Sequence, residues 1–408
     1  MKDGKKPRPI RSFFIKLISF LLFLLLIVGV GLYSFFDINP AEGLADGFTG
    51  LYNRVLSIGQ EEIIQKVKTI TALNASEALA YDARDDGFLL CSISALRFYN
   101  DEGEEKWYLP VELKKPFIRA NGKKTFLADL SGRYFAMAGE GNILWEKTLD
   151  EDIVGAGLYD SWVYVITRSE LAGYKRSIRL YSVDGDEIAF RNVSDYYPIS
   201  LYHFPSYNSQ GFIVCGVETQ GLQTTGVFEF LNLAMSQTGS VRGEEELFFS
   251  AMALGREKLV LAGENSLLCV DSSLKTLWSK KPEKDNFTAA AVFNGSEVIA
   301  ASLDQELYDR EKKVSSQLAI YDEDGKEKYN LKLDGMVTGI SVYGDVAAVL
   351  CGPEVYFIGK NGEIKDMYTA RSNVEAVRLS RGDTAYIISQ GELIRFKIDM
   401  QRKFLGIF

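Results

Sequence analysis

Few side chains in this sequence are of the kinds that assemble a catalytic centre. His203 is the only histidine, and a Ser-His-Asp triad or a multi-histidine metal centre needs further histidines or very specific companions. Tyrosines lie close to it in sequence and favour a structural hydrogen bond for its ring: Tyr196, Tyr197, Tyr202 and Tyr207. The chain contains no Gly-x-Ser-x-Gly elbow, P-loop or dinucleotide fingerprint. We therefore predict no catalytic residues and no enzymatic activity.

Two further motifs have the composition of a binding site. Asp322-Glu-Asp-Gly325 is acidic enough to attract calcium, but it lacks the additional oxygen ligands and the glutamate that complete an EF-hand loop. Arg381-Gly-Asp383 spells an adhesion tripeptide, and a match of three residues arises easily. Both motifs contain residues that favour tight turns, and we interpret both as turns between strands. The sequence thus predicts no metal site and no bound cofactor.

The cysteines are far apart, and each ends an apolar run: Cys91, Cys215, Cys269 and Cys351. Because no two are close in sequence, no CxxC metal or redox motif exists. We interpret all four as buried, small hydrophobic residues. A disulfide between cysteines on neighbouring strands stays open on geometric grounds.

A turn, usually at a glycine, followed about four residues later by a large side chain recurs after residue 70. The pairs are Gly103/Trp107, Gly141/Trp145, Gly185/Phe190, Leu274/Trp278, Gly325/Tyr329 and Gly362/Asp366, with leucine replacing glycine at 274 and the aromatic lost at 366. Asp-Gly and Asn-Gly favour two-residue hairpins, and the flanking runs are rich in β-branched and aromatic residues. The spacing is roughly 40 residues, which is typical of a four-stranded propeller blade.

The repeat predicts an all-β, eight-bladed β-propeller over residues 71–408. Eight blades correspond to about 42 residues each, whereas the alternative of seven blades requires about 48. One unit reads as four strands at Asp152–Gly157, Trp162–Thr167, Ile178–Val183 and Glu187–Asn192. The last unit reads as strands at Val374–Leu379, Thr384–Ser389, Leu393–Ile398 and Lys403–Phe408.

These glycine and tryptophan positions resemble the quinoprotein-type, or PQQ-like, propeller repeat. The resemblance implies that the tryptophans dock neighbouring blades together. An enzyme of that family would also hold a quinone cofactor and Ca²⁺ at the axis, commonly beside a vicinal disulfide. This chain has no adjacent cysteine pair, and the ligand set cannot be assigned to any of its positions. The overall layout is similar to uncharacterised membrane-anchored propellers of Gram-positive bacteria.

The N-terminal segments predict a membrane anchor. Residues 1–16 form a basic arm, with six basic side chains and one acidic. Residues 17–36 are 20 residues without a charge, enough to span about 30 Å as a transmembrane helix. A cleavable signal peptide is the alternative, but its apolar region is normally shorter and ends in a small-residue cleavage site. Residues 37–70 have apolar residues at helical spacing and predict a helical juxtamembrane stalk.

The charge distribution sets expectations for location and partners. Basic residues before the apolar run and acidic residues after it place the N-terminus in the cytoplasm and the propeller outside. The net charge of −9 disfavours nucleic-acid binding, which relies on cationic contacts to phosphate. We expect a non-catalytic protein-interaction scaffold of the cell envelope, in contact with the bilayer through residues 17–36 and with other envelope proteins. The alternatives are binding of a small molecule or glycan at the propeller axis, with residues 216–225 as a rim loop, and a PQQ-like enzyme.

Overall fold

The computed structural model describes residues 66–73, 79–159, 161–204, 211–220, 223–308, 311–389 and 391–400. The regular structure of these residues is β-strand, arranged as eight four-stranded antiparallel sheets. The predicted basic arm, the predicted transmembrane helix and the predicted stalk up to residue 65 lie outside the described residues. Within the described residues, no helix has both the length and the apolarity needed to cross a membrane.

The strands follow one another along the chain in eight groups. The first four groups are β2 (Ala80–Arg84), β3 (Gly87–Cys91), β4 (Ala95–Asn100), β5 (Glu105–Pro110); β6 (Pro116–Asn121), β7 (Lys124–Asp129), β8 (Tyr134–Gly139), β9 (Asn142–Thr148); β10 (Ile153–Tyr159), β11 (Trp162–Arg168), β12 (Arg176–Ser182), β13 (Glu187–Val193); β14 (Tyr197–Tyr202), β15 (Gly211–Gln220), β16 (Gln223–Asn232), β17 (Gln237–Glu244).

The remaining four groups complete the ring, and the last one takes its fourth strand from the start of the chain. They are β18 (Phe248–Leu254), β19 (Lys258–Gly263), β20 (Leu267–Asp271), β21 (Thr276–Lys280); β22 (Phe287–Phe293), β23 (Glu297–Tyr308), β24 (Glu311–Tyr321), β25 (Glu327–Asp334); β26 (Val337–Tyr343), β27 (Val346–Cys351), β28 (Glu354–Gly359), β29 (Ile364–Thr369); and β30 (Val374–Arg381), β31 (Thr384–Ser389), β32 (Glu392–Lys397) with β1 (Val67–Ala72).

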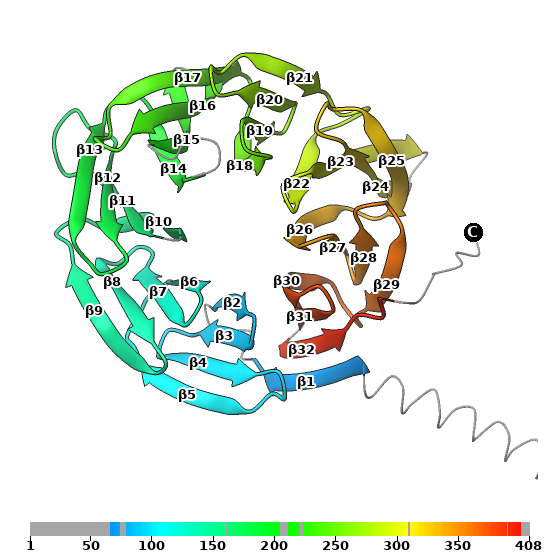
Figure 1. The fold of residues 1–408 in the computed structure, drawn as a ribbon, viewed down its shortest axis with the longest axis horizontal. Coiled ribbons are helices and arrows are strands. Elements are labelled where there is room, and N and C mark those ends of the chain that lie inside the picture. Colours follow the sequence, from blue (N-terminus) through cyan, green and yellow to red (C-terminus); the bar gives the residue numbers. More distant parts are fainter. Residues whose placement is uncertain are drawn as a thin grey trace, which may run out of the picture. The chain divides into compact units, whose positions relative to one another are not determined.

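Each group is one blade of a closed propeller, and we number the blades 1 to 8 from β2 onward (Figure 1). The first strand of every blade lies nearest the axis and the fourth lies at the rim (Figure 1). The prediction of eight blades is therefore confirmed. The four strands predicted for residues 152–192 correspond to β10–β13, with bounds that differ by one or two residues.

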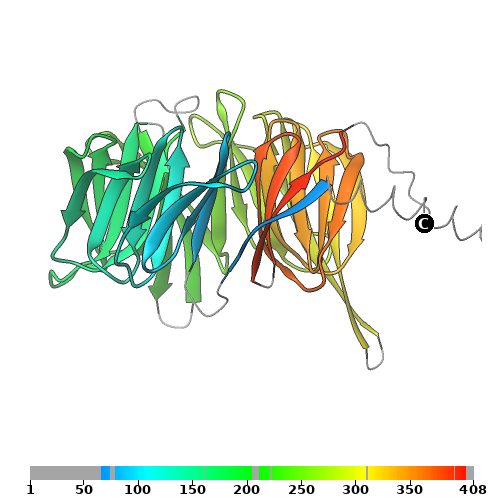
Figure 2. The same cartoon turned by 90° about the horizontal axis from the view of Figure 1, so that it is seen from below.

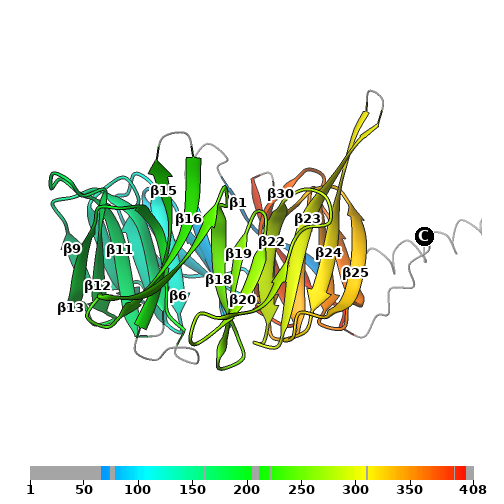
Figure 3. The ribbon, with the colours of Figure 1, turned by 90° about the horizontal axis from the view of Figure 1, so that it is seen from above.

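The two faces of the ring differ in their connections. The turns that join the first strand of each blade to its second, and the third to its fourth, lie on what we call the turn face. The links between second and third strands, and between blades, lie on the hairpin face. On that face β15/β16 of blade 4 and β23/β24 of blade 6 are lengthened to between 10 and 12 residues per strand. The β23/β24 hairpin projects well beyond the ring (Figures 2 and 3).

The closure of the ring corrects two predictions. Strand β1 pairs with β32 from Val67↔Phe396 to Ala72↔Glu392, so the fourth strand of blade 8 is Val67–Ala72. The predicted fourth strand at 403–408 lies outside the described residues. The propeller thus begins at residue 67 rather than 71, and residues 67–70 of the predicted helical stalk are a strand. The Val-Lys-Thr-Ile-Thr sequence is rich in β-branched residues, and pairing with β32 outweighs the helical spacing of its apolar positions.

The hydrophobic core is divided among the contacts between blades. Eight clusters of buried side chains are present in the described residues, and each draws its members from two consecutive blades. The cluster around Phe88 and Tyr386 joins blade 1 to blade 8. A single sheet has two apolar faces, so each blade is covered only when both neighbours are in place.

The recurring turn and its large side chain meet across these contacts. A Cβ atom built on the turn glycine of one blade would lie within 3.3 Å of a side chain from the blade before it. The pairs are Ile70 with Gly103, Trp107 with Gly141, Trp145 with Gly185, Trp278 with Gly325 and Tyr329 with Gly362. Trp145 and Trp278 also donate their indole N–H groups to carbonyl oxygens in the next blade's turn, at 2.9 and 3.0 Å. The docking role implied by the PQQ-like resemblance thus matches the observed contacts.

Asp366 occupies the repeat position where the aromatic residue is lost. Its side chain is buried and lies 2.6 Å from the Lys66 ammonium group. The same carboxylate accepts hydrogen bonds from the backbone N–H groups of Asp399 and Met367, each at 2.9 Å. Lys66 precedes β1, Asp399 follows β32, and these are the two strands that close the ring. Asp366 therefore connects both of these strands to its own blade, blade 7.

We predict that Gly362→Ala destabilises the propeller more than Gly344→Ala. Both glycines have positive φ, at 80° and 59°, so alanine costs about 1–2 kcal/mol at either position from the backbone alone. A Cβ at 362 would also lie 2.1 Å from the Tyr329 ring, whereas nothing lies within 4 Å of one at 344. The overlap adds roughly 1–3 kcal/mol. Urea unfolding followed by tryptophan fluorescence measures the difference, and equal midpoints for the two variants would contradict the docking contact.

We also predict that Asp366→Ala lowers the free energy of unfolding by about 2–4 kcal/mol, because it leaves the Lys66 charge and the Asp399 N–H without their acceptor. The matched control is Asp345→Ala, which removes a half-exposed ion pair with Lys360 and should cost less than about 1 kcal/mol. Amide hydrogen exchange provides the second measurement, with faster exchange expected in β1 and β32. Uniform exchange across all blades would argue against a closure role.

Candidate functional site

His203 has the structural role predicted for it. It is buried at the end of blade 4's first strand, and its Nδ1 atom lies 2.9 Å from the carbonyl oxygen of Gly211. The carbonyl can only accept, so Nδ1 carries the proton in this contact. The ring packs against Phe212 and Trp162. These contacts account for both the position and the orientation of the imidazole.

The two short motifs are turns, as predicted. The Asp322 Oδ1 atom accepts hydrogen bonds from the backbone N–H groups of Asp324 and Lys326, at 3.1 and 2.8 Å. These hydrogen bonds stabilise the turn that contains Asp322. Arg381 donates to the backbone carbonyl of Asp85 at 2.6 Å, and Asp383 pairs with Lys397 at 2.8 Å. No group of three or more His, Cys, Asp or Glu residues in the described ranges is placed to hold a metal ion.

The four cysteines are free thiols and are buried in different blades. Burial raises the pKa of Cys91 and Cys215 to about 12, and that of Cys269 and Cys351 to about 11. A thiol reacts as its thiolate, so these side chains are unreactive near neutral pH. They pack as small hydrophobic residues, as the sequence predicted.

Exposed apolar side chains gather on the hairpin face. Of the sixteen large apolar side chains that are exposed in the described residues, eight lie on this face and three lie on the turn face. The eight are Ile93, Leu171, Tyr174, Tyr197, Ile199, Leu247, Phe249 and Met336. Seven of them come from blades 3, 4, 5 and 7, within the arc of five blades, from 3 to 7, that carries the two long hairpins. We call these seven residues the apolar face.

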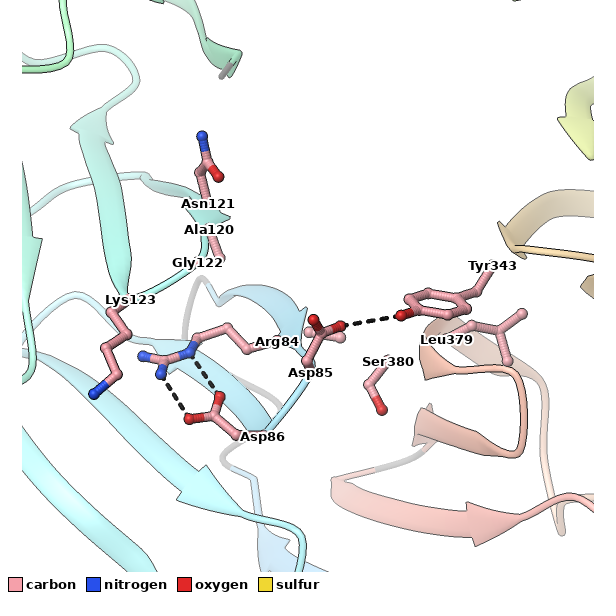
Figure 4. A pocket seen from close by; sticks show the side chains of 11 residues that line it. Arg84, Asp85, Asp86, Ala120, Asn121, Gly122, Lys123, Tyr343, Leu379 and Ser380 are labelled. Atoms are coloured by element: carbon pink, nitrogen blue, oxygen red, sulfur yellow. Dashed lines mark hydrogen bonds and ion pairs between the residues drawn. The ribbon is translucent and has the colours of Figure 1, made fainter. Parts of the chain in front are cut away.

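The axial channel opens on the turn face through a polar mouth of about 410 Å³. The mouth is formed by blades 1, 2, 7 and 8 (Figure 4). Arg84 donates two hydrogen bonds to Asp86, at 2.9 and 2.8 Å, and Lys123 pairs with Glu140 at 2.7 Å. The hydroxyl of Tyr343 donates to the Asp85 carboxylate at 3.3 Å. Three of the four charged side chains in this mouth are therefore in ion pairs within the protein.

A second cavity in the channel has a different character. It measures about 390 Å³ and lies between the first strands of blades 2, 3 and 4. We call it the Arg119 pocket, because Arg119 is the one charged residue in its lining. Its other polar side chains carry hydroxyls, on Tyr159, Tyr164, Tyr202 and Ser200. Burial raises the pKa of Tyr159 and Tyr202, so both phenols stay protonated. The Tyr202 hydroxyl donates to the carbonyl oxygen of Phe249 at 3.4 Å.

Two glycines, Gly155 and Gly157, leave space for the neighbouring groups that form one wall of this pocket. A Cβ built on Gly157 would lie 2.2 Å from the ring of Tyr164, and one on Gly155 would lie 3.0 Å from the Ile199 carbonyl oxygen. Tyr164, from the second strand of blade 3, therefore reaches across its neighbour into the pocket lining. Burial raises the pKa of Tyr164 to about 12.

The opposite wall of the channel carries mainly small and aliphatic side chains. A cavity of about 670 Å³ lies along the first strands of blades 5 and 6 and is lined largely by alanine, valine and methionine. We call it the alanine pocket. It adjoins the Arg119 pocket at blade 4, where the rings of Tyr202 and Phe204 stack at 6.0 Å and each lines one of the two cavities. The channel thus has Arg119 and aromatic side chains on one side and mainly small, aliphatic side chains on the other.

Neither binding feature was identified in the sequence. Residues 216–225, predicted as a rim loop, are largely the ends of β15 and β16, which continue as a paired hairpin to Gln220↔Gln223. The Arg119 pocket combines residues that are tens of positions apart, and only the blade register brings them together. The spacing Gly155-x-Gly157 within an inner strand was its one local signal, since glycine in a strand often marks a close approach.

The fold defines the chain as an eight-bladed β-propeller, with cavities along its axis. The model of a family of unknown function (DUF5711) matches residues 60–397, and the chain belongs to that family. A search of curated proteins finds no match.

Solved structures of low sequence identity share the fold. BamB from Moraxella catarrhalis, a PQQ-like propeller, is 14% identical with a TM-score of 0.54, covering 82% of this chain and 99% of that one. The C-terminal WD40 domain of Sif2 is 11% identical with a TM-score of 0.61, covering 81% and 98%. The Dos1 propeller is 12% identical with a TM-score of 0.57, covering 81% and 94%. The fold therefore resembles both PQQ-like and WD40 propellers.

Proposed function

We propose that this protein is a membrane-anchored, extracytoplasmic scaffold of the cell envelope that binds another protein through its hairpin face without catalysing a reaction. The observation that carries the proposal is the apolar face, together with the two hairpins that project beside it. Exposed apolar side chains that gather on one face of a soluble domain are typical of protein-interaction sites. The β-propeller fold is itself commonly used as an interaction scaffold, because its closed ring presents broad faces of loops.

The path of the chain is compatible with this role. Strand β1 runs from the turn face at Val67 toward the hairpin face at Ala72, since it pairs antiparallel with β32. The polypeptide that leads to the proposed anchor at residues 17–36 therefore joins the propeller on the turn face. The hairpin face carries no such attachment. An anchored binding face has a raised effective concentration toward other proteins in the same membrane.

Charge and composition favour a protein partner over nucleic acid. The chain has a net charge of −9, which opposes the cationic contacts that nucleic-acid binding requires. The exposed residues of the apolar face include tyrosine, phenylalanine and methionine, which are enriched in protein interfaces. Leu171 is the most exposed of them at 53%.

If the protein is a scaffold that binds through its hairpin face, substitutions on that face alone should weaken binding of the partner protein. Leu171→Glu with Leu247→Glu changes the apolar face, whereas Leu233→Glu with Leu144→Glu makes equivalent changes on the turn face and the rim. We expect the first pair to reduce recovery of a co-purifying envelope protein about tenfold or more, and the second pair to leave recovery unchanged. The measurement is quantitative affinity capture of the full-length chain from solubilised membranes. A partner retained equally by both pairs would refute binding at the hairpin face.

The membrane topology is tested separately by labelling introduced cysteines. Because the native cysteines are unreactive, a cysteine introduced at Lys123, whose side chain is 73% exposed, reports on location. We expect Lys123→Cys to react with a membrane-impermeant maleimide on intact cells, and Lys5→Cys in the basic arm to react only after permeabilisation. The unsubstituted chain serves as the blank. Labelling of Lys123→Cys only in lysed cells would place the propeller inside.

A further inference from the structure

We propose that the axial channel binds a small organic anion, with its oxyanion group at Arg119 and its apolar body directed toward the alanine pocket. This ligand site borders the hairpin face at Ile199, which lines the Arg119 pocket, but it does not depend on the scaffold role. Small-molecule binding at the propeller axis is an alternative that the sequence suggested without residues. The proposal names the residues and the class of ligand.

The Arg119 guanidinium is available to a ligand. Its side chain is 42% exposed, and its ion pair in the described residues is a long one, with Nη1 at 3.9 Å from Asp82 Oδ1. The Asp82 carboxylate is meanwhile engaged by the backbone, because Oδ2 accepts the N–H of Ala120 at 2.8 Å and Oδ1 accepts that of Ala83 at 3.1 Å. A guanidinium pairs most strongly with an oxyanion through short, parallel hydrogen bonds. The contact with Asp82 leaves that capacity unused.

The remainder of the pocket favours an anion over a cation. Its lining contains no carboxylate, which is the acceptor that an organic cation would use. Tyr159 lies close enough to Arg119 for the two charges to interact, and its hydroxyl adds a donor to the pocket. A phenol with a raised pKa remains a donor over the physiological pH range. A donor and one positive charge in a partly enclosed space are complementary to a carboxylate or a phosphate group.

The aliphatic side chains that line the alanine pocket argue that the anion carries a hydrophobic body. The Arg119 pocket and the alanine pocket meet at the stacked rings of Tyr202 and Phe204. Their volumes, about 390 and 670 Å³, lie in the range of small-molecule sites, roughly 300–1,000 Å³. Burial of an alkyl or aryl group against alanine, valine and methionine side chains removes apolar surface from water on both partners. An inorganic anion would use only half of this channel.

The test compares probes that differ in one feature each. Hexanoate carries both the oxyanion and the apolar chain, acetate lacks the chain, 1-hexanol lacks the charge, and inorganic phosphate supplies a bare oxyanion. Saturation-transfer difference NMR on the full-length chain in non-ionic detergent, with detergent alone as the blank, measures their affinities. We expect hexanoate to bind with a Kd of about 1 mM, as befits a fragment of few atoms, and the other three probes to bind at least tenfold more weakly.

Matched variants locate the site. Arg119→Gln should weaken hexanoate at least tenfold, whereas Arg133→Gln, a half-exposed arginine of the same blade that pairs with Asp152, should leave it unchanged. Ala253→Leu narrows the alanine pocket and should weaken hexanoate but not acetate. The melting temperature of each variant shows whether the fold is intact. Equal hexanoate binding by Arg119→Gln and the unsubstituted chain, 1-hexanol binding as tightly as hexanoate, or no hexanoate binding would each overturn the proposal.

Discussion

The structure depends on one constraint, which is that no blade encloses a hydrophobic core of its own. Each four-stranded sheet exposes apolar side chains on both faces, and each of the eight buried clusters is completed by a neighbouring blade. An open row of blades would leave two apolar faces in water. Closure between blades 8 and 1 therefore contributes to the stability of every other contact, and the hydrogen-bonded pairing of β1 with β32 joins the two ends of the propeller within blade 8.

Near the turn face, the side chains of two neighbouring blades together fill the space at their junction. Either blade can supply the large side chain. Most junctions place a large side chain of one blade on a turn glycine of the next. Between blades 4 and 5 the sizes are exchanged, since Leu274 occupies the turn and Gly239 faces it. A Cβ on Gly239 would lie 2.5 Å from the Leu274 side chain. Leu274 accepts a positive φ of 64°, a cost of roughly 1–2 kcal/mol, and fits because its partner has no side chain.

Two junctions replace this contact with charge. Between blades 3 and 4, Arg191 pairs with the buried Glu229 at 2.8 Å and donates to the carbonyl of Met235. Between blades 7 and 8, Asp366 accepts from Lys66 and from Asp399. An aromatic ring fills space against one turn, but a carboxylate can fix two separate chain segments at once. Blade 8 has no turn between its third and fourth strands, because those strands come from opposite ends of the propeller, so the loss of the aromatic residue at 366 suits closure.

The parts of this fold that could be predicted from the sequence are those that repeat. Glycine-turn spacing predicted eight blades because the same junction is built at nearly constant intervals. Residues 67–70 were expected to be helical because a single strand without its partner has no local signature, and its pairing with β32 is a contact across the whole propeller. The length of the hairpin at 216–225 was missed for a similar reason, since its strand pairing continues past the repeat. Arg119 has no neighbour in sequence that marks it as a binding residue.

The repeat also explains where features specific to this chain can occur. The fourth strands, and the turns that join third to fourth strands, are committed to junctions between blades, and a change there disturbs the ring. The long hairpins between second and third strands extend beyond those contacts, whereas the first strands of neighbouring blades also pack against one another around the axis. The elongated β15/β16 and β23/β24 hairpins lie on the hairpin face, and the Arg119 pocket lies where the first strands of blades 2, 3 and 4 meet. The proposed partner-binding face therefore lies where closure of the ring leaves the chain unconstrained, whereas the proposed ligand site is built from strands that also hold the ring together.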